Sequence, residues 1–521
     1  MRSLAVVLLV CAVALLAPHP ACAADDEPPP PPAPEFGAIE TYHEPQIADD
    51  LGLGWTRIIF YWSELKKDGR YLWNWFHHPL GRIDREIAGG REVVGLLQHT
   101  PAFATDGSEG AGVPRGLYLP IDDPGNEWAV FVREVTTAYR GRITRWIIWN
   151  EPDIAPDDYG TLWEGSIEDY YRLLKVAYLV AHEVDPTIQI HLGGLTYWHN
   201  PAYLHDLLDV IAADPEAAAH GYYFDVVSVH LYFKPETTIE IINTLRAALD
   251  EHGLDKPIWI NETNAPPYDD PAQPWDNPVF RVTQEMQASF LMQEFALALA
   301  LGVERIAVYK LIDEPPLAPG FEPYGLIRTD RTPRPAFTAF EVITQHYSRT
   351  QSAALLERPE LFEVILSRQA GLVTRVLWAR TPTALVVEVP ALAGSALLAD
   401  QENSTAIVLP QAGSYRLMLE GAPCVSGVEC LMGGRPLVLV EEAPPPEPDA
   451  AVARVIAAVP PGAPLPDAAR LQDAAAPRQT QMAPQVSAVS NRTLLLTLGL
   501  AAVGLFVAAL LASREGGEPA S

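Results

Sequence analysis

The chain has 521 residues, enough for two or three domains, and a formal charge of −30 from 36 basic and 66 acidic residues. It contains no run of basic residues, so nucleic acid, which proteins bind through clustered cationic side chains, is not an expected partner. The same charge disfavours a strongly anionic polymer and favours a neutral substrate.

Residues 1–23 have the pattern of a secretory signal peptide. A single Arg2 precedes a long apolar run, and the small residues "ACA" then form a cleavage site. We expect the mature chain to begin at about Ala24. A lipoprotein signal ending at Cys22 fits less well, because His19 stands where such a signal needs an aliphatic residue.

The Pro-rich residues 24–35 are expected to form an extended tether. In residues 36–350, runs of apolar and β-branched residues alternate with helical patterns. The runs are nearly continuous, which is typical of strands buried on both faces. The expected strands are 36–43, 55–62, 91–100, 145–152, 188–196, 224–233, 257–263 and 305–312.

Helical patterns lie between these strands. In residues 166–185, Ser166 is an N-cap, apolar residues share one face, and Pro186 ends the helix. Residues 237–254 end at Gly253 in a left-handed cap. Eight strands, each followed by a helix, predict an α/β fold, the (β/α)8 or TIM barrel. An open doubly wound sheet is the alternative, but no Gly-rich phosphate-binding turn follows an early strand. Further helices are expected at 282–302 and 334–347.

The pattern changes after residue 350. Residues 351–442 contain short strands broken by Gly, Pro and Asn, which predicts a small all-β sandwich. We favour a role for this domain as a buttress for the barrel over polysaccharide binding. Cys424 and Cys430 are expected to form a disulfide in an exported protein, with free thiols as the alternative. Residues 443–492 are rich in Pro and Ala and lack aromatic residues, which predicts a disordered stalk.

Residues 493–512 are uncharged and match the roughly 20 apolar residues that cross a bilayer. We therefore expect a transmembrane helix. A GPI-type signal fits less well, because the polar residues 513–521 follow the apolar stretch. An exported amino terminus and one span would leave 513–521 as a cytoplasmic tail and anchor the barrel outside the cell membrane.

Polar side chains end several predicted barrel strands, where the active sites of such barrels lie. Alternation along the fourth strand puts Glu151 on the same side as Ile147. Alternation along the seventh strand puts Glu262 on the same side as Ile260. Both glutamates are therefore expected to face the barrel axis at its mouth. The strand-end residues are His99, Glu151, His230 with Tyr232, and Glu262.

Two converging carboxyl groups are the minimum apparatus for cleaving a glycosidic bond. One must be protonated to donate to the leaving oxygen, and the other must be anionic to attack the anomeric carbon. Proximity of like charges raises the pKa of one of them. The alternative, in which each glutamate caps a helix or pairs with an arginine, is less favoured because Asn150 and Asn261 precede Glu151 and Glu262 in the same way.

The segments "WNEP" (149–152) and "WINET" (259–263) resemble the acid/base and nucleophile segments of the clan A retaining glycoside hydrolases, nearest to families 39 and 5. The resemblance extends over about residues 36–350 through "HLGGL", "DVVSVHLY" and "YGLIRTDRTPRPAF". It implies that Glu151 is the acid/base, that Glu262 is the nucleophile, and that no cofactor is needed.

The resemblance also implies roles for neighbouring residues. Asn150 would contact the 2-hydroxyl of the sugar, and His230 or Tyr232 would position the nucleophile. Arg57, after "GLGWT", matches an arginine that such enzymes place near the nucleophile.

Two further positions are less defined. The eighth strand reads "VYKLID", whereas relatives have a tryptophan in the floor of the sugar site, so Tyr309 or Lys310 is expected to enter that site. His99 would either bind substrate or satisfy a buried backbone carbonyl. Some aromatic residues of the predicted mouth should stack on sugar rings, although packing is the commoner role for any one of them. These are Trp62, Trp73, Trp75, Trp163, Trp198, Trp275, Phe321 and Tyr324.

Together these features predict a membrane-anchored extracellular glycosidase with an oligo- or polysaccharide substrate and no obligate protein partner. A separation of about 5 to 5.5 Å between the carboxyl groups of Glu151 and Glu262 would fit a retaining mechanism, and about 9 Å an inverting one. A carbohydrate-binding or adhesive surface protein with an inactive barrel, and a transglycosylase, remain alternatives.

Overall fold

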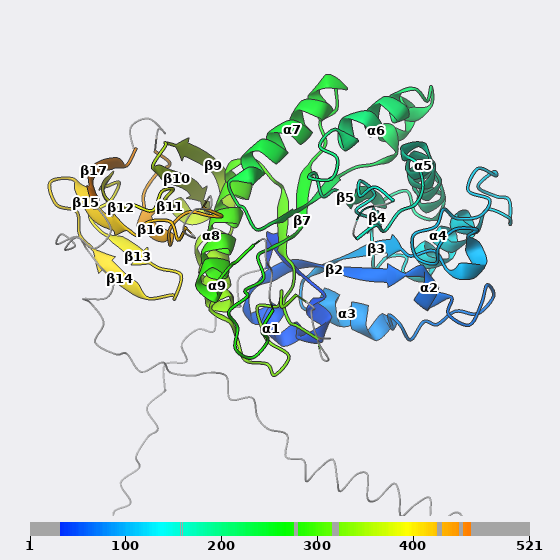
Figure 1. The fold of residues 1–521 in the computed structure, drawn as a ribbon, viewed down its shortest axis with the longest axis horizontal. Helices are drawn as coiled ribbons and strands as arrows, with labels where there is room; N and C mark the ends of the chain where they lie inside the picture. Colours follow the sequence, from blue (N-terminus) through cyan, green and yellow to red (C-terminus); the bar gives the residue numbers. More distant parts are fainter. Residues whose placement is uncertain are drawn as a thin grey trace, which may run out of the picture. The chain divides into compact units, whose positions relative to one another are not determined.

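The computed structural model describes residues 32–459 except 157, 159, 276–279, 315–321, 425–429 and 447–451 (Figure 1). The predicted signal peptide, most of the tether, the predicted membrane helix at 493–512 and the tail lie outside the described residues. Within these described ranges, no helix is both long and apolar enough to cross a membrane.

Eight parallel strands form one sheet in the order β5-β4-β3-β2-β1-β8-β7-β6. Bridges that pair His191 with Val226 and Leu195 with Val229 join the two ends of this sheet, so it closes into the predicted barrel. The first strand begins at Ala33, inside the segment predicted as tether. The strands are β1 (Ala33–Ile39), β2 (Leu53–Tyr61), β3 (Glu92–Gln98), β4 (Arg145–Asn150), β5 (Gln189–Gly194), β6 (Val227–Tyr232), β7 (Ile258–Asn264) and β8 (Arg305–Val308).

Helices follow the strands and cover the barrel. The predicted cap of α5 is present, because the Ser166 hydroxyl accepts from the Asp169 backbone N–H and Asp169 accepts from the Ser166 backbone N–H. Gly253 after α7 has a φ of 68°, as expected for a left-handed cap. The helices are α1 (Pro45–Asp50), α2 (Trp62–Leu65), α3 (Leu80–Ala88), α4 (Glu127–Ala138), α5 (Ile167–Val184), α6 (Tyr203–Ala212), α7 (Thr237–Glu251), α8 (Gln284–Ala300) and α9 (Pro335–His346), with 3-10 turns η1 (Thr41–His43), η2 (Ala102–Ala104), η3 (Ala217–Tyr223) and η4 (Gln369–Gly371).

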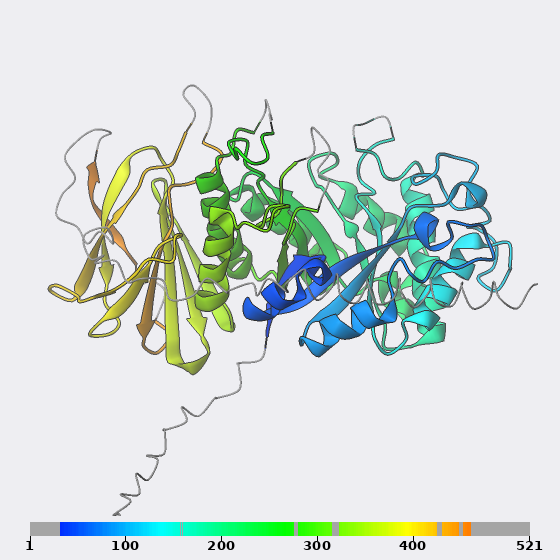
Figure 2. The ribbon, with the colours of Figure 1, turned by 90° about the horizontal axis from the view of Figure 1, so that it is seen from below.

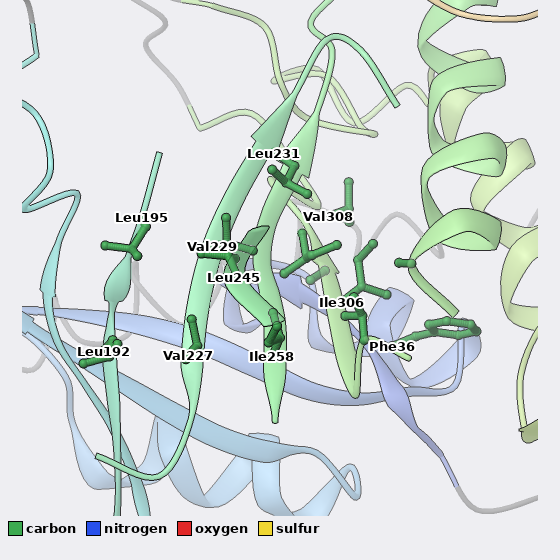
Figure 3. Close-up of a cluster of buried hydrophobic side chains, with 14 of the residues drawn as sticks. Phe36, Leu192, Leu195, Val227, Val229, Leu231, Leu245, Ile258, Ile306 and Val308 are labelled. Carbon is green, nitrogen blue, oxygen red and sulfur yellow. The ribbon is translucent and has the colours of Figure 1, made fainter. Parts of the chain in front are cut away.

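Both faces of the barrel strands are buried, which explains their continuous apolar sequences. One set of side chains packs between the strands and the surrounding helices, as Figure 3 shows for Val229, Ile258 and Leu245. A smaller set fills the barrel interior. The buried interior residues are Ile39, Trp55, Val94, Leu96, Ile147, Val226, Trp259 and Ala307.

The carboxyl-terminal part of the chain forms the predicted β-sandwich. A six-stranded sheet has the order β14-β13-β16-β11-β10-β9, and a three-stranded sheet has the order β15-β12-β17. The structure also pairs Cys424 with Cys430 in a disulfide. The strands are β9 (Thr350–Glu357), β10 (Leu361–Arg368), β11 (Leu372–Ala379), β12 (Ala384–Pro390), β13 (Ala396–Ala399), β14 (Thr405–Val408), β15 (Ser414–Leu419), β16 (Leu437–Glu442) and β17 (Arg454–Val459).

The last strand corrects the predicted start of the stalk. Residues 443–492 were expected to be disordered from their composition, but β17 lies within them and pairs antiparallel with β12. Val455 and Val459 lie among the Pro- and Ala-rich residues and suit an edge strand. This segment forms a strand because its backbone pairs with that of β12. Composition alone does not predict such a pairing.

The sandwich packs against α8 of the barrel (Figure 2). Gln293 on this helix donates to the Gly434 carbonyl at 2.9 Å and accepts from the Gly433 N–H at 3.0 Å. Ser289, one turn earlier, donates to the Gln401 side chain at 2.7 Å. Because α8 is covered on both sides, its buried Ser289 and Gln293 bond to the sandwich, an arrangement that fits the predicted buttress.

Candidate active site

Glu262 reaches the barrel mouth because β7 contains a bulge. Ile258 and Ile260 pack in the outer layer, so simple alternation would point Glu262 outward as well. The pairing with β6 shifts, however: Val229 faces Ile260, and the next residue, His230, faces Glu262. Asn261 is therefore an extra residue that turns Glu262 to the other face. Glu262 lies in the expected position, but the predicted alternation along the strand was wrong.

Glu151 also owes its direction to a break in alternation. Ile147 lies in the barrel interior, but Trp149 packs outside, and its indole N–H donates to the Leu162 carbonyl at 2.7 Å. Trp149 and Glu151 have left-handed φ values of 72° and 47°. These two residues redirect the end of β4, and the Glu151 backbone N–H then donates to the Gly194 carbonyl of β5 at 3.1 Å.

Glu262 is held by a buried cation and a phenol. The Arg57 guanidinium, which is fully buried, forms an ion pair with one carboxylate oxygen, and the Tyr232 hydroxyl donates to the other at 2.5 Å. Burial acts to raise the pKa of Glu262. The charges of Arg57 and His230, with the Tyr232 hydroxyl, outweigh burial and hold this pKa below its ordinary value. Glu262 is therefore kept as an anion.

His230 lies between the two glutamates. Its Nδ1 is 2.7 Å from Glu151 Oε1 and 3.6 Å from Glu262 Oε2. Burial acts to lower the pKa of His230, but the two carboxylates, Glu262 most strongly, outweigh burial and raise it. One oxygen of each glutamate and one nitrogen of His230 all lie within 4.8 Å of one another. The two carboxyl groups therefore converge at the mouth.

Gly194 makes room for this imidazole. A Cβ atom at position 194 would lie 2.0 Å from His230 Nε2, so a larger residue would displace the ring. The sequence motif "HLGGL" contains this glycine, but its purpose is visible only from the packing of β5 against β6.

The other predicted site residues fall into two groups. Tyr309 belongs to the site, because its ring lies 6.4 Å from the Tyr232 ring. Asn150 ends β4 directly before Glu151, and its Oδ1 has no hydrogen-bond partner among the described residues. His99 instead forms its hydrogen bond with a residue other than the two glutamates. Its Nδ1 is 2.6 Å from Ser63 Oγ, and within the described ranges it forms no hydrogen bond with either glutamate.

Sequence reasoning missed Tyr61, Glu40, His43 and Glu314 at the same end of the barrel. Burial is the largest cause that raises the pKa of Tyr61, and the negative charges of Glu40 and Glu262 also act to raise it. Tyr61 is therefore close enough to both carboxylates to be affected by their charge. Tyr61 ends β2 as other polar residues end their strands, which was the available signal. His43 pairs with Glu314, and one ligand atom from each of Glu40, His43 and Glu314 lies within 4.8 Å of the others.

Among the described residues, two groups of side chains are close enough to hold a metal ion: the one formed by Glu40, His43 and Glu314 and the one formed by Glu151, His230 and Glu262. At the second group the guanidinium of Arg57 already neutralises Glu262 and would repel a cation. The side chains of Glu151, His230 and Glu262 are therefore better suited to acid–base catalysis than to metal binding.

The aromatic residues predicted to lie at the mouth differ in their burial and stacking. Trp62 and Trp163 are buried in the core. Trp73 and Trp75 stack on each other, with ring centres 4.3 Å apart and planes 1° apart. Trp198 is different because 54% of it is exposed. Phe321 lies outside the described residues.

The fold is shared with solved glycoside hydrolases at low sequence identity. A family 39 glycoside hydrolase from the gut symbiont Bacteroides cellulosilyticus WH2 has a TM-score of 0.60 and 16% identity, over 78% of this chain and 81% of that chain. A GH30 endoxylanase from Clostridium papyrosolvens C71 has a TM-score of 0.52 and 13% identity, over 79% and 97%. The catalytic domain of GH30 xylanase C from Talaromyces cellulolyticus has a TM-score of 0.52 and 13% identity, over 78% and 96%.

No protein-family model matches the chain, and no curated protein matches it in sequence. The structural likeness confirms the predicted (β/α)8 barrel, which is the fold of the clan A glycoside hydrolases. At such identities the likeness concerns the fold, and function is therefore inferred from the site itself.

Proposed function

We propose that this chain is a glycoside hydrolase that cleaves O-glycosyl bonds of an oligo- or polysaccharide with retention of configuration. The observation that carries the proposal is the convergence of Glu151 and Glu262, with one oxygen of each within 4.8 Å of the other. This proximity favours the short carboxyl separation of retaining enzymes over the roughly 9 Å that leaves room for a water molecule.

In the first step, Glu262 attacks the anomeric carbon and Glu151 protonates the leaving oxygen. Arg57 and Tyr232 keep Glu262 anionic and fix its orientation, so little reorganisation is needed at the moment of attack. The glycosidic bond breaks, a Glu262–glycosyl ester forms, and the proton of Glu151 leaves with the departing alcohol.

In the second step, Glu151 acts as a base. Esterification removes the charge of Glu262, which lowers the proton affinity of Glu151 and leaves it as a carboxylate. It then takes a proton from a water molecule that attacks the anomeric carbon and releases Glu262. His230, which bonds Glu151 at 2.7 Å, is suited to hold its carboxylate in place in both steps.

Product stereochemistry tests this mechanism. The full chain is incubated with a panel of aryl glycosides, beginning with β-xylosides because two solved relatives are described as xylanases. Proton NMR during the first minutes is expected to show the sugar released with the anomeric configuration of the substrate. Initial release of the opposite anomer would contradict the double-displacement mechanism, and no release from any glycoside would contradict the proposed activity.

We also propose that the protein is exported and anchored to the cell membrane with its barrel outside. The support is the sequence alone: the signal pattern of residues 1–23 and the apolar residues 493–512.

Fractionation tests the anchor. The full chain, produced in a bacterium with its own signal, is expected to remain in the membrane pellet after a carbonate wash. A chain that ends at residue 492 should instead be released in soluble form, and mass spectrometry should place the mature amino terminus of both near Ala24. A soluble full chain, or one that keeps Met1, would contradict this part of the proposal.

A further inference from the structure

Trp198 is an aromatic residue that the loop after β5 presents to solvent. It is 54% exposed, although the adjacent Tyr197 is only 5% exposed. Among the described residues, its one ring neighbour is Tyr197, in an edge-to-face contact at 83° with ring centres 5.2 Å apart. At least one face of the indole is therefore open, although exposing such a large apolar surface is unfavourable.

The loop that carries Trp198 is tied to the loop that carries Glu151. Asp153 lies two residues after Glu151 and is 4% exposed. Its carboxylate accepts from the Thr196 backbone N–H at 2.9 Å, from the Thr196 hydroxyl at 2.8 Å and from the Tyr197 backbone N–H at 2.9 Å. One buried carboxylate thus fixes both loops relative to each other.

The position of Trp198 can be related to the reaction through this link. Glu151 must lie beside the oxygen that it protonates, which belongs to the leaving group. A loop bonded to the Glu151 turn is therefore expected on the leaving-group side of the site. On the other side of Trp198, His199 Nδ1 lies 3.3 Å from Asp158 Oδ2.

Trp75 offers a comparison. It is 36% exposed, but one face of its indole is covered by Trp73. The pocket beside it is lined by Phe76, Leu80 and Tyr139, and the Tyr139 hydroxyl is already bonded to the His78 carbonyl at 2.6 Å. Trp75 therefore has one indole face covered by Trp73 and, among the described residues, lines a mostly apolar pocket.

We propose that Trp198 is the stacking platform for the first sugar of the leaving group, and that the natural substrate is therefore cleaved between two sugar residues. This inference rests on the proposed function. Sugar rings present C–H faces that pack on an aromatic plane, and a platform fixed by Asp153 binds such a ring without further ordering of the loop.

The test compares two substrates with the same glycone. A glycosyl fluoride leaves no sugar to stack on Trp198, whereas the corresponding disaccharide does; β-xylosyl fluoride and xylobiose are the first pair. In Trp198→Ala, kcat/KM for the disaccharide should fall about tenfold (~1.4 kcal/mol) with that for the fluoride unchanged. Trp198→Phe should restore most of the loss, and Trp75→Ala should change neither value.

Equal losses on both substrates, or no loss on either, would overturn the role of Trp198. Failure of the wild-type full chain to cleave any glycosyl fluoride or disaccharide of the panel would instead overturn the proposed function itself. The two failures are distinguishable because the first requires an active wild-type protein.

Discussion

Glu262→Ala is expected to lower kcat/KM for every glycoside by about 10⁴-fold or more, because no glycosyl-enzyme can form without the nucleophile. The loss should be similar for substrates with good and poor leaving groups, since attack at the anomeric carbon is common to both. The measurement is the initial rate on an aryl glycoside and on a disaccharide of the same sugar.

Azide gives this variant a distinctive signature. The shortened side chain leaves space for a small anion on the face of the sugar that Glu262 normally attacks. Azide bound there should restore part of the activity and yield a glycosyl azide of inverted configuration, which NMR identifies. Glu251→Ala, an exposed carboxylate on α7, is the matched control and should retain full activity.

Stability must be followed in the same experiment. Removal of Glu262 leaves the fully buried Arg57 without its ion-pair partner, which can cost about 3–5 kcal/mol of unfolding free energy. Glu262→Gln keeps a polar partner for Arg57 and Tyr232 and should be more stable than Glu262→Ala while being equally inactive. Full activity in Glu262→Gln would remove Glu262 from the mechanism.

The barrel itself could be predicted from the sequence because its signals are local. Strands buried on both faces leave continuous apolar runs, as in residues 146–149. The cap at Ser166 depends only on a side chain next to the helix end, and the cap at Gly253 depends only on a left-handed backbone. Such features need no knowledge of distant partners.

The directions of the two glutamates could not be predicted in the same way. Alternation fails at Trp149 because its indole packs against Trp128 of α4, and it fails at Asn261 because the register with β6 changes there. Both breaks depend on residues far away in the chain. The prediction that Glu151 and Glu262 meet succeeded because strand ends gather at the mouth of a barrel, whatever the exact parity.

Elements defined by their partners were also missed. β17 is an edge strand within the predicted stalk and exists because β12 supplies its hydrogen bonds. Gln293 has no partner on its own helix that would explain its burial, and its role follows only from the backbone of residues 433 and 434.

Glu151→Ala should separate substrates by leaving group, which Glu262→Ala should not. Loss of the general acid is expected to lower kcat/KM for a disaccharide by about 10³–10⁴-fold, because an alkoxide is a poor leaving group. For the glycosyl fluoride, kcat/KM should change little, since fluoride departs without a proton, but kcat should fall because water then lacks its base.

Azide needs no base, so it should release the glycosyl-enzyme of this variant as a glycosyl azide of retained configuration. The opposite stereochemistry of the azide products from Glu151→Ala and Glu262→Ala distinguishes the acid/base from the nucleophile. A binding or adhesive protein would give neither product. If Glu151→Ala lowered kcat/KM equally for the fluoride and the disaccharide, Glu151 would act on the geometry of the site through His230, to which it is bonded at 2.7 Å, and not as the proton donor.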